Sequence, residues 1–274
     1  MSNNPLRQYF RRPALYISLP SKGKYYPQGT LDMPENGELP VYPMTAIDEI
    51  TSKTPDALFN GNAVVDIIKS CVPGIKDPWS LPSTDVDTIL IAIRAATNGN
   101  DLEIDSYCPA CEETSKYGVN LIGLLGGINA SGYNDGLKIG ELEIKFKPLT
   151  YREVNAGNLA QFEVRREINN IDTITDDTQK SQQSSITMKK LTEMNIALVA
   201  NTIESINLPN VVVDNPEFIS EYLHGCDKNT FNHIREHVVK LREGSTIKPM
   251  KIKCVSCANE YEQSLALNVT DFFE

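Results

Sequence analysis

Two pairs of cysteines have the spacing that binds a metal ion. The pairs are Cys108 with Cys111 and Cys254 with Cys257, and two residues separate the members of each pair. A C-x-x-C segment turns so that both sulfurs face one point, and zinc completes a tetrahedral shell with four thiolates at ~2.3 Å. The sequence therefore predicts one Zn²⁺ site that uses both pairs. Because four protein ligands leave no open position, we expect the ion to be structural.

The distance between the pairs leaves other interpretations open. The halves of such a zinc site commonly lie about 15 to 20 residues apart, whereas 142 residues separate Cys111 from Cys254. Two independent dithiols, or one disulfide within each pair, are the alternatives. Thioredoxin-like redox chemistry needs the motif at the start of a helix, but strand-like sequence follows each pair here.

Similar sequence surrounds both pairs. Alternating residues typical of strands precede each pair, and a tyrosine (Tyr117 or Tyr261) and another alternating run follow it. We therefore predict that residues 101–125 and 246–274 form the two halves of a small zinc-ribbon-like antiparallel sheet. Residues 126–245 would then be an insertion, a hairpin followed by helices, whose ends the metal ties together.

A pair of histidines offers a second motif. His233 and His237, with Glu236, spell H-x-x-E-H on a predicted helix, the order that inverted zinc peptidases use. A third ligand would have to come from elsewhere, and both histidines flank the apolar stripe, where half-exposed histidines are ordinary. No phosphate-binding glycine loop, nucleophile elbow or Ser-His-Asp set has a suitable context. We therefore expect a protein without enzymatic activity.

Composition narrows the class of protein. The chain has 274 residues, 41% of them hydrophobic, which suffices for one large or two modest globular domains. Its net charge of -10 is spread thinly, which argues against nucleic acid or an anionic membrane as the main partner. No apolar run reaches the ~18 residues of a membrane span, so a soluble protein is expected. The cysteine usage indicates a reducing compartment, with Cys71 and Cys226 as buried free thiols.

Apolar periodicity and capping residues predict the elements that position the cysteines. We expect a mobile N-terminal arm over residues 1–15 and a region of loops and helices over 16–100. Helices are predicted at 45–53, 62–71, 84–97, 150–168, 188–206, 215–224 and 227–242. A hairpin is predicted at 137–147, and a flexible loop or helix break at 169–185. Arg94, beside the apolar face of its helix, is expected to be solvated. The fold class is α+β, mainly helical, with the helical domain inserted between the two halves of the small sheet.

Several motifs in the first half resemble a known family. They are Leu19-Pro-Ser-Lys-Gly23 with Tyr26-Pro27, Tyr42-Pro-Met-Thr-Ala46 with Asp48-Glu49, and Arg94 ahead of the first cysteine pair. Together they resemble the baseplate hub subunit and hub assembly proteins of T-even-type contractile-tailed bacteriophages. The resemblance covers Tyr16 to about Cys111, and in the second half it rests on Lys147-Pro-Leu-Thr-Tyr151.

The resemblance implies a tail morphogenesis protein, made late in infection, that is a structural component or an assembly chaperone of the central baseplate hub. It implies other hub and tail proteins as partners, with the tape-measure protein as a candidate and oligomerisation within the baseplate as an option. The location would be the host bacterial cytoplasm during assembly, or the virion tail. The zinc site rests on the cysteines alone. The alternative is a zinc-ribbon nucleic-acid-binding or transcription accessory protein, against which the net acidity argues.

Overall fold

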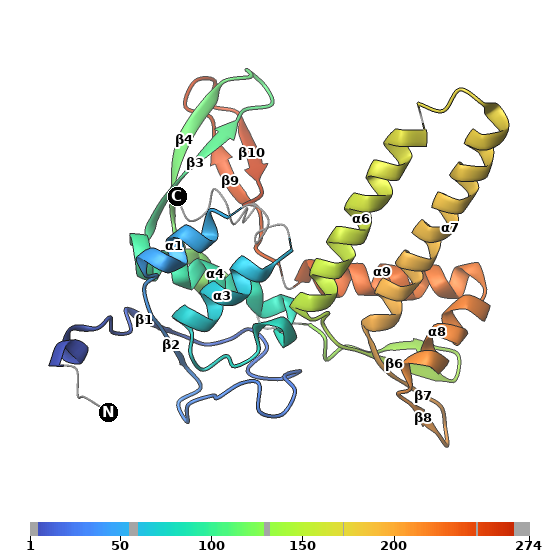
Figure 1. The fold of residues 1–274 in the computed structure, drawn as a ribbon, viewed down its shortest axis with the longest axis horizontal. Coiled ribbons are helices and arrows are strands. Elements are labelled where there is room, and N and C mark those ends of the chain that lie inside the picture. Colours follow the sequence, from blue (N-terminus) through green and yellow to red (C-terminus); the bar gives the residue numbers. More distant parts are fainter. Residues whose placement is uncertain (1–4, 55–59, 129–131, 172, 245, 266–274) are drawn as a thin grey trace. The chain divides into compact units, whose positions relative to one another are not determined.

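The computed structural model of the chain combines helices with small antiparallel sheets (Figure 1). The described residues are 5–54, 60–128, 132–171, 173–244 and 246–265. This mixture agrees with the predicted α+β class. The chain divides into two compact units, which we call unit 1 and unit 2. Unit 1 consists of Met1–Pro78, Thr84–Ala130 and Ser245–Glu274, and unit 2 of Trp79–Ser83 and Ser131–Gly244.

Unit 1 is built around helix α4 (Ser83–Asn98). From Thr84 to Ala95 every side chain except that of Asp87 is buried. A helix that is buried on all sides needs protein around it, so α4 lies within the core of unit 1. Other elements of unit 1 precede and follow α4 in the chain. They are η1 (Pro5–Tyr9), β1 (Leu15–Ile17), β2 (Leu39–Val41), α1 (Ala46–Ser52), α3 (Asn62–Cys71), β3 (Asp101–Tyr107), β4 (Thr114–Asn120), α5 (Leu121–Gly127), β9 (Met250–Lys253) and β10 (Glu260–Gln263), while η2 (Pro78–Ser80) lies at the boundary with unit 2.

A buried carboxylate fixes the loop that follows β1. Asp85 of α4 accepts hydrogen bonds from the backbone N–H of Ser21 at 2.8 Å, from the Ser21 hydroxyl, and from the Tyr26 hydroxyl at 2.9 Å. Burial raises the pKa of Asp85, although these donors favour its charged form. The loop turns at Gly23, whose φ of 77° suits glycine better than any other residue. The loop is thus tied to the core of unit 1.

Unit 2 contains a four-stranded antiparallel sheet and four helices. The strands lie in the order β5 (Leu137–Ile139), β6 (Leu142–Phe146), β7 (Ile203–Asn207) and β8 (Val212–Val213). The helices are α6 (Tyr151–Ile171), α7 (Asp177–Asn201), α8 (Pro216–Gly225) and α9 (Lys228–Gly244). The β5–β6 hairpin turns at Gly140, as predicted, with a φ of 60°. The buried apolar side chains of unit 2 include Ile144 and Phe146 from the sheet, Ile219 from α8 and Ile234 from α9.

The predicted break at 169–185 and the predicted helix at 188–206 are both wrong in part. Helix α7 begins at Asp177, because the Asp176 side chain accepts a hydrogen bond from the N–H of Gln179 and caps the first turn. Its first half is polar and exposed, so apolar periodicity gives no sign of it. At the other end, Ile203–Asn207 leaves the helix and becomes the strand β7, which pairs with β6 and β8.

Three smaller expectations also need correction. Arg94 is buried, with 8% of its surface exposed, and is not solvated. Residues 121–125 were assigned to the small sheet, but they lie in α5, because the Asn120 side chain accepts a hydrogen bond from the N–H of Gly123 and starts a helix. The last predicted strand of the ribbon extends beyond the described residues, which end at 265. Within the described stretches, no helix is both long and apolar enough to cross a membrane.

Candidate metal centre

Each cysteine pair lies in the turn of a two-stranded hairpin of unit 1. Strand β3 pairs with β4 along its whole length, and β9 pairs with β10. Cys108 directly follows the last residue of β3, and Cys254 directly follows the last residue of β9. Both turns therefore begin with a cysteine, and in both the second cysteine lies three residues further on.

The two turns have the same backbone geometry. In the first, the N–H of Glu112 donates to the carbonyl of Cys108 at 2.9 Å. In the second, the N–H of Ala258 donates to the carbonyl of Cys254 at 3.0 Å. Glu112 and Ala258 both have a positive φ, 61° and 59°, which is uncommon for residues other than glycine. The similarity of the two flanking sequences is therefore also a similarity of structure.

The four sulfur atoms of the two turns lie together. All are within 4.8 Å of one another. The Sγ atom of Cys108 is 3.7 Å from that of Cys257, and the Sγ atom of Cys111 is 3.6 Å from that of Cys254. A disulfide has an S–S distance of ~2.05 Å, whereas a tetrahedron with metal–sulfur bonds of ~2.3 Å has edges of about 3.8 Å. The spacing is that of four thiols around one point, which can hold a metal ion.

Backbone N–H groups stabilise the thiolate of the first cysteine in each turn. Burial disfavours the charged form of Cys108, yet the N–H groups of Ala110 and Cys111, together with hydrogen bonds from the Cys111 and Cys254 thiols, outweigh this and lower the pKa of Cys108 to about 6. The N–H of Cys257 likewise lowers the pKa of Cys254, against the effect of burial. Donors directed at sulfur are the usual second shell of a thiolate metal site, because they offset part of its negative charge.

The second cysteine of each turn has the opposite shift. The N–H of Glu113 favours the thiolate of Cys111, but hydrogen bonds with the other thiols raise the pKa of Cys111 to about 12. The pKa of Cys257 is also raised, although the N–H of Asn259 acts in the other direction. Four thiolates this close repel one another, which is why the two cysteines of each turn have pKa values shifted in opposite directions.

Side chains, and not backbone pairing, join the two hairpins. The Ser106 hydroxyl lies 2.8 Å from the Tyr261 hydroxyl and donates to Gln263 Oε1 at 2.8 Å. The Tyr117 hydroxyl of β4 also donates to the carbonyl of Lys253 in β9, at 3.2 Å. The predicted single sheet is therefore corrected to two separate two-stranded sheets, because the hydrogen bonds given above between the hairpins involve side chains and form no backbone ladder.

The histidine pair is not part of a metal cluster. His237 Nε2 lies 3.1 Å from the carbonyl oxygen of Asp135, and its ring packs at 4.9 Å from the ring of Phe146. In the part of the chain that the structure describes, the four cysteines are the one group of potential metal ligands that lies close enough together. Cys71 and Cys226 lie outside this group as free thiols, the first buried and the second half-buried.

Comparison with known families decides what kind of protein this is. Residues 27–274 match the model of the family described as T4 bacteriophage base plate protein. The chain belongs to this family. Its resemblance to proteins of the T-even-type baseplate is thereby confirmed, and the match extends through the second half of the chain, so the protein is located in the phage tail. No curated protein and no solved structure matches the chain significantly.

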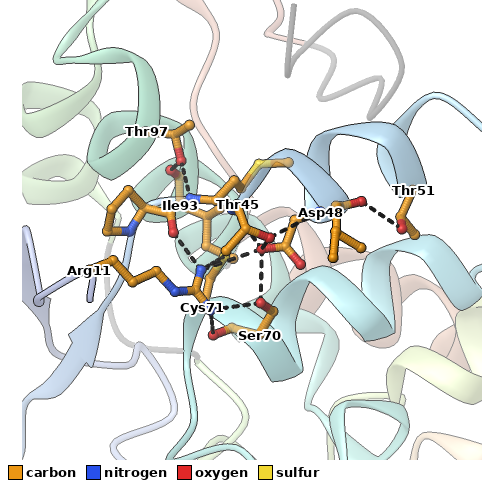
Figure 2. A network of polar contacts seen from close by, with 11 residues as sticks. Arg11, Thr45, Asp48, Thr51, Ser70, Cys71, Ile93 and Thr97 are labelled. Carbon is orange, nitrogen blue, oxygen red and sulfur yellow. Dashed lines mark hydrogen bonds and ion pairs between the residues drawn. The ribbon is translucent and has the colours of Figure 1, made fainter. Parts of the chain in front are cut away.

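One of the motifs that suggested the family forms a polar network in this base plate protein (Figure 2). The Asp48 carboxylate accepts a hydrogen bond from the backbone N–H of Thr45 at 2.8 Å, and the Asp48 N–H donates to the Thr45 hydroxyl oxygen at 3.3 Å, which forms the capping box of α1. The Thr45 hydroxyl also donates to the Asp48 carboxylate at 2.8 Å. The same Asp48 oxygen accepts a hydrogen bond from the Ser70 hydroxyl at 2.8 Å. One carboxylate thus begins α1 and connects this helix to the end of α3.

Arg11 completes the network, a role that the sequence did not reveal. Its guanidinium donates to the carbonyl of Pro43 and to the carbonyl and hydroxyl of Ser70, the last two at 2.7 and 2.8 Å, and it lies 3.4 Å from Asp48. The prediction of a mobile arm over residues 1–15 is therefore wrong at Arg11, and also at Leu15, which lies in β1. Residues 1–4 of that arm are outside the described residues.

Proposed function

We propose that this base plate protein contributes to the central hub of the phage base plate and acts by binding other tail proteins. The family match over residues 27–274 is the observation that carries the proposal. The motifs that resemble hub proteins add support. Two residues of these motifs, Asp48 and Tyr26, make hydrogen bonds that hold the fold of unit 1 together. In this proposal the protein is a structural component or an assembly chaperone, made in the host cytoplasm, and it performs no catalysis.

Fractionation of infected cells tests the assignment to the hub. If the proposal holds, antibodies detect the protein in hub assembly intermediates, and tail proteins co-purify with it. A structural component remains in purified virions, whereas a chaperone is present in the intermediates and absent from the virion. Absence from both fractions would contradict the hub assignment, and retention on DNA at physiological salt would favour the alternative of a nucleic-acid-binding protein.

We also propose that Cys108, Cys111, Cys254 and Cys257 hold one structural Zn²⁺ ion. Four sulfur ligands at tetrahedral spacing suit zinc, which forms closed Cys₄ sites. Matching turns with backbone donors directed at sulfur support the same assignment. Bound there, the ion would connect the β3–β4 and β9–β10 hairpins, in addition to the hydrogen bonds made by Ser106 and Tyr117.

Elemental analysis of the natively purified protein tests the zinc site. We expect one zinc ion per chain, and no bound zinc after Cys254→Ser, because three sulfurs leave the shell incomplete. Cys226→Ser is the matched control, since Cys226 is a free thiol outside the cluster and its variant should keep the ion. Zinc-free wild-type protein that has the same stability with and without added zinc would contradict this assignment.

A further inference from the structure

A short stretch near the N-terminus exposes large apolar side chains. We call residues 5–12 the N-terminal segment. Tyr9 is 78% exposed, Phe10 59% and Leu6 61%. Aromatic side chains of this kind contribute most of the binding energy in many protein interfaces. The segment therefore has the composition of a binding element.

The segment has a fixed attachment to unit 1. Arg11 lies within it, and its hydrogen bonds to Pro43 and Ser70 tie it to the regions of α1 and α3 (Figure 2). Tyr9 and Phe10 directly precede this anchor, so their position is restricted before any partner binds. Restriction of this kind reduces the entropy that binding costs.

The charge of the segment is opposite to that of the remaining chain. Residues 5–12 contain three basic and no acidic residues, and one of the three, Arg11, lies 3.4 Å from Asp48. The other 266 residues contain 23 basic and 36 acidic residues, a net charge of -13. Arg12, at the end of the segment, is exposed. The binding element is thus basic, on a protein whose remaining surface is acidic.

One exposed face of unit 1 complements the segment. Asp101, Glu103 and Asp105 alternate along β3 and are all exposed, and the same face ends at Tyr107, which is 55% exposed. We call this row of side chains the acidic face of β3. Lys116 of β4 is exposed opposite Asp105 on the same face and forms an ion pair with Glu103 at 3.5 Å. The face therefore offers the carboxylates of Asp101 and Asp105 to arginine, and the ring of Tyr107 to the apolar side chains. Figure 1 shows the ribbon of η1, in dark blue, apart from the ribbon of β3.

We propose that the N-terminal segment of one copy binds the acidic face of β3 on a second copy. The two surfaces are different, so the contact is heterologous and joins copies head to tail. If the rotation that relates neighbouring copies returns to the first copy after a whole number of steps, the contact forms a closed ring; if it does not, the contact forms an open chain of copies. The occupant of each acidic face is therefore the same protein, and each bound copy presents a further acidic face.

Light scattering across a range of protein concentrations tests this interface. We expect the wild-type protein to associate reversibly, with weaker association at high salt. The double variant Tyr9→Ser with Phe10→Ser, and separately the double variant Asp101→Asn with Asp105→Asn, should each associate roughly thirtyfold more weakly, the loss expected for hot-spot side chains. Phe218→Ser in α8 is the matched control, because Phe218 is 58% exposed in unit 2 and its loss should leave association unchanged.

Mixing the two double variants distinguishes this contact from other forms of association. The first variant keeps an intact acidic face and the second keeps an intact segment, so the mixture should form heterodimers that grow no further. Circular dichroism should show that both variants are folded. A wild-type protein that is monomeric at every concentration would overturn the proposal. So would association that neither double variant weakens, or a mixture that forms no heterodimers.

Discussion

At the scale of single residues, the sequence predicted the candidate metal ligands and missed the buried charged groups. The four cysteines were found because C-x-x-C is a local pattern, and similar flanking sequences linked the two pairs. Asp85 and Arg11 gave no such signal. Asp85 binds Ser21, 64 positions away, and Arg11 binds Ser70, 59 positions away. Without knowledge of distant partners, a charged residue is expected to be solvated, because charged side chains are rarely buried unless they are paired.

His224 provides a prediction at this scale. Its Nε2 atom lies 2.7 Å from a Glu193 carboxylate oxygen, and its Nδ1 atom lies 2.8 Å from the carbonyl of Ser220. Both neighbours are acceptors, so the imidazolium, with two N–H donors, fits better than the neutral ring, and the pKa of His224 is raised above 6.5. This contact therefore stabilises the fold fully below the unfolded pKa of ~6.5, and the contribution is lost as pH rises through the folded value.

An NMR titration of the histidine side chains measures this shift. The chain has three histidines, so the resonances can be assigned with single variants. We expect the pKa of His224 to fall towards its ordinary value in Glu193→Gln, which removes the carboxylate that causes most of the shift. Equal His224 pKa values in the wild type and this variant would show that the contact is absent in solution.

At the scale of helices and strands, prediction succeeded where local signals mark both ends. Helix α3 matches its predicted bounds because a regular apolar pattern fills it and Pro73-Gly74 follows it. The end of α7 was missed because no glycine or proline separates this helix from β7, and the strand is defined only by its pairing with β6. Strand formation there depends on a partner some 60 residues earlier in the chain, which no local pattern shows.

The Arg11 network provides a prediction at the scale of elements. Arg11→Ala removes the cation beside Asp48 and the donors to Pro43 and Ser70, which lie in three separate segments of unit 1. We expect a loss of about 1.5–3 kcal/mol in the free energy of unfolding, the range for hydrogen bonds that involve charged groups. Urea denaturation measures this loss.

The adjacent Arg12→Ala is the matched control for the network. Arg12 carries the same charge but is exposed, so its removal should change the free energy of unfolding by less than about 0.5 kcal/mol. Equal effects of the two substitutions would mean that the network contributes nothing specific to the stability of unit 1.

At the scale of the whole molecule, the convergence of the cysteines was predictable, but the arrangement of the strands was not. Matching motifs implied that the sulfurs meet, and they lie within 4.8 Å. Whether the hairpins share a ladder depends on how their edges approach, and no local pattern shows this; side-chain hydrogen bonds of Ser106, Tyr117 and Tyr261 join them instead. The division into two compact units also depends on contacts between distant residues.

Removal of the metal should affect the two units differently. If zinc joins the hairpins, a chelator should increase deuterium uptake in β9, β10 and both cysteine turns. Helices α6 to α9 belong to unit 2 and should keep their protection. Hydrogen–deuterium exchange with mass spectrometry measures both regions in one experiment, and Cys226→Ser should behave like the wild type. A uniform increase across both units, or no increase at the hairpins, would contradict the role assigned to the ion.

The order of the cysteines along the chain has a consequence for protein synthesis. The first pair leaves the ribosome 142 residues before the second, and domains begin to fold during translation. Until Cys254 and Cys257 emerge, the β3–β4 hairpin presents two thiols without their counterparts, and any bound ion is incompletely coordinated. Tight metal capture would therefore require synthesis through Cys257, and ribosome-bound chains that stop before Cys254 should exchange zinc freely with the medium.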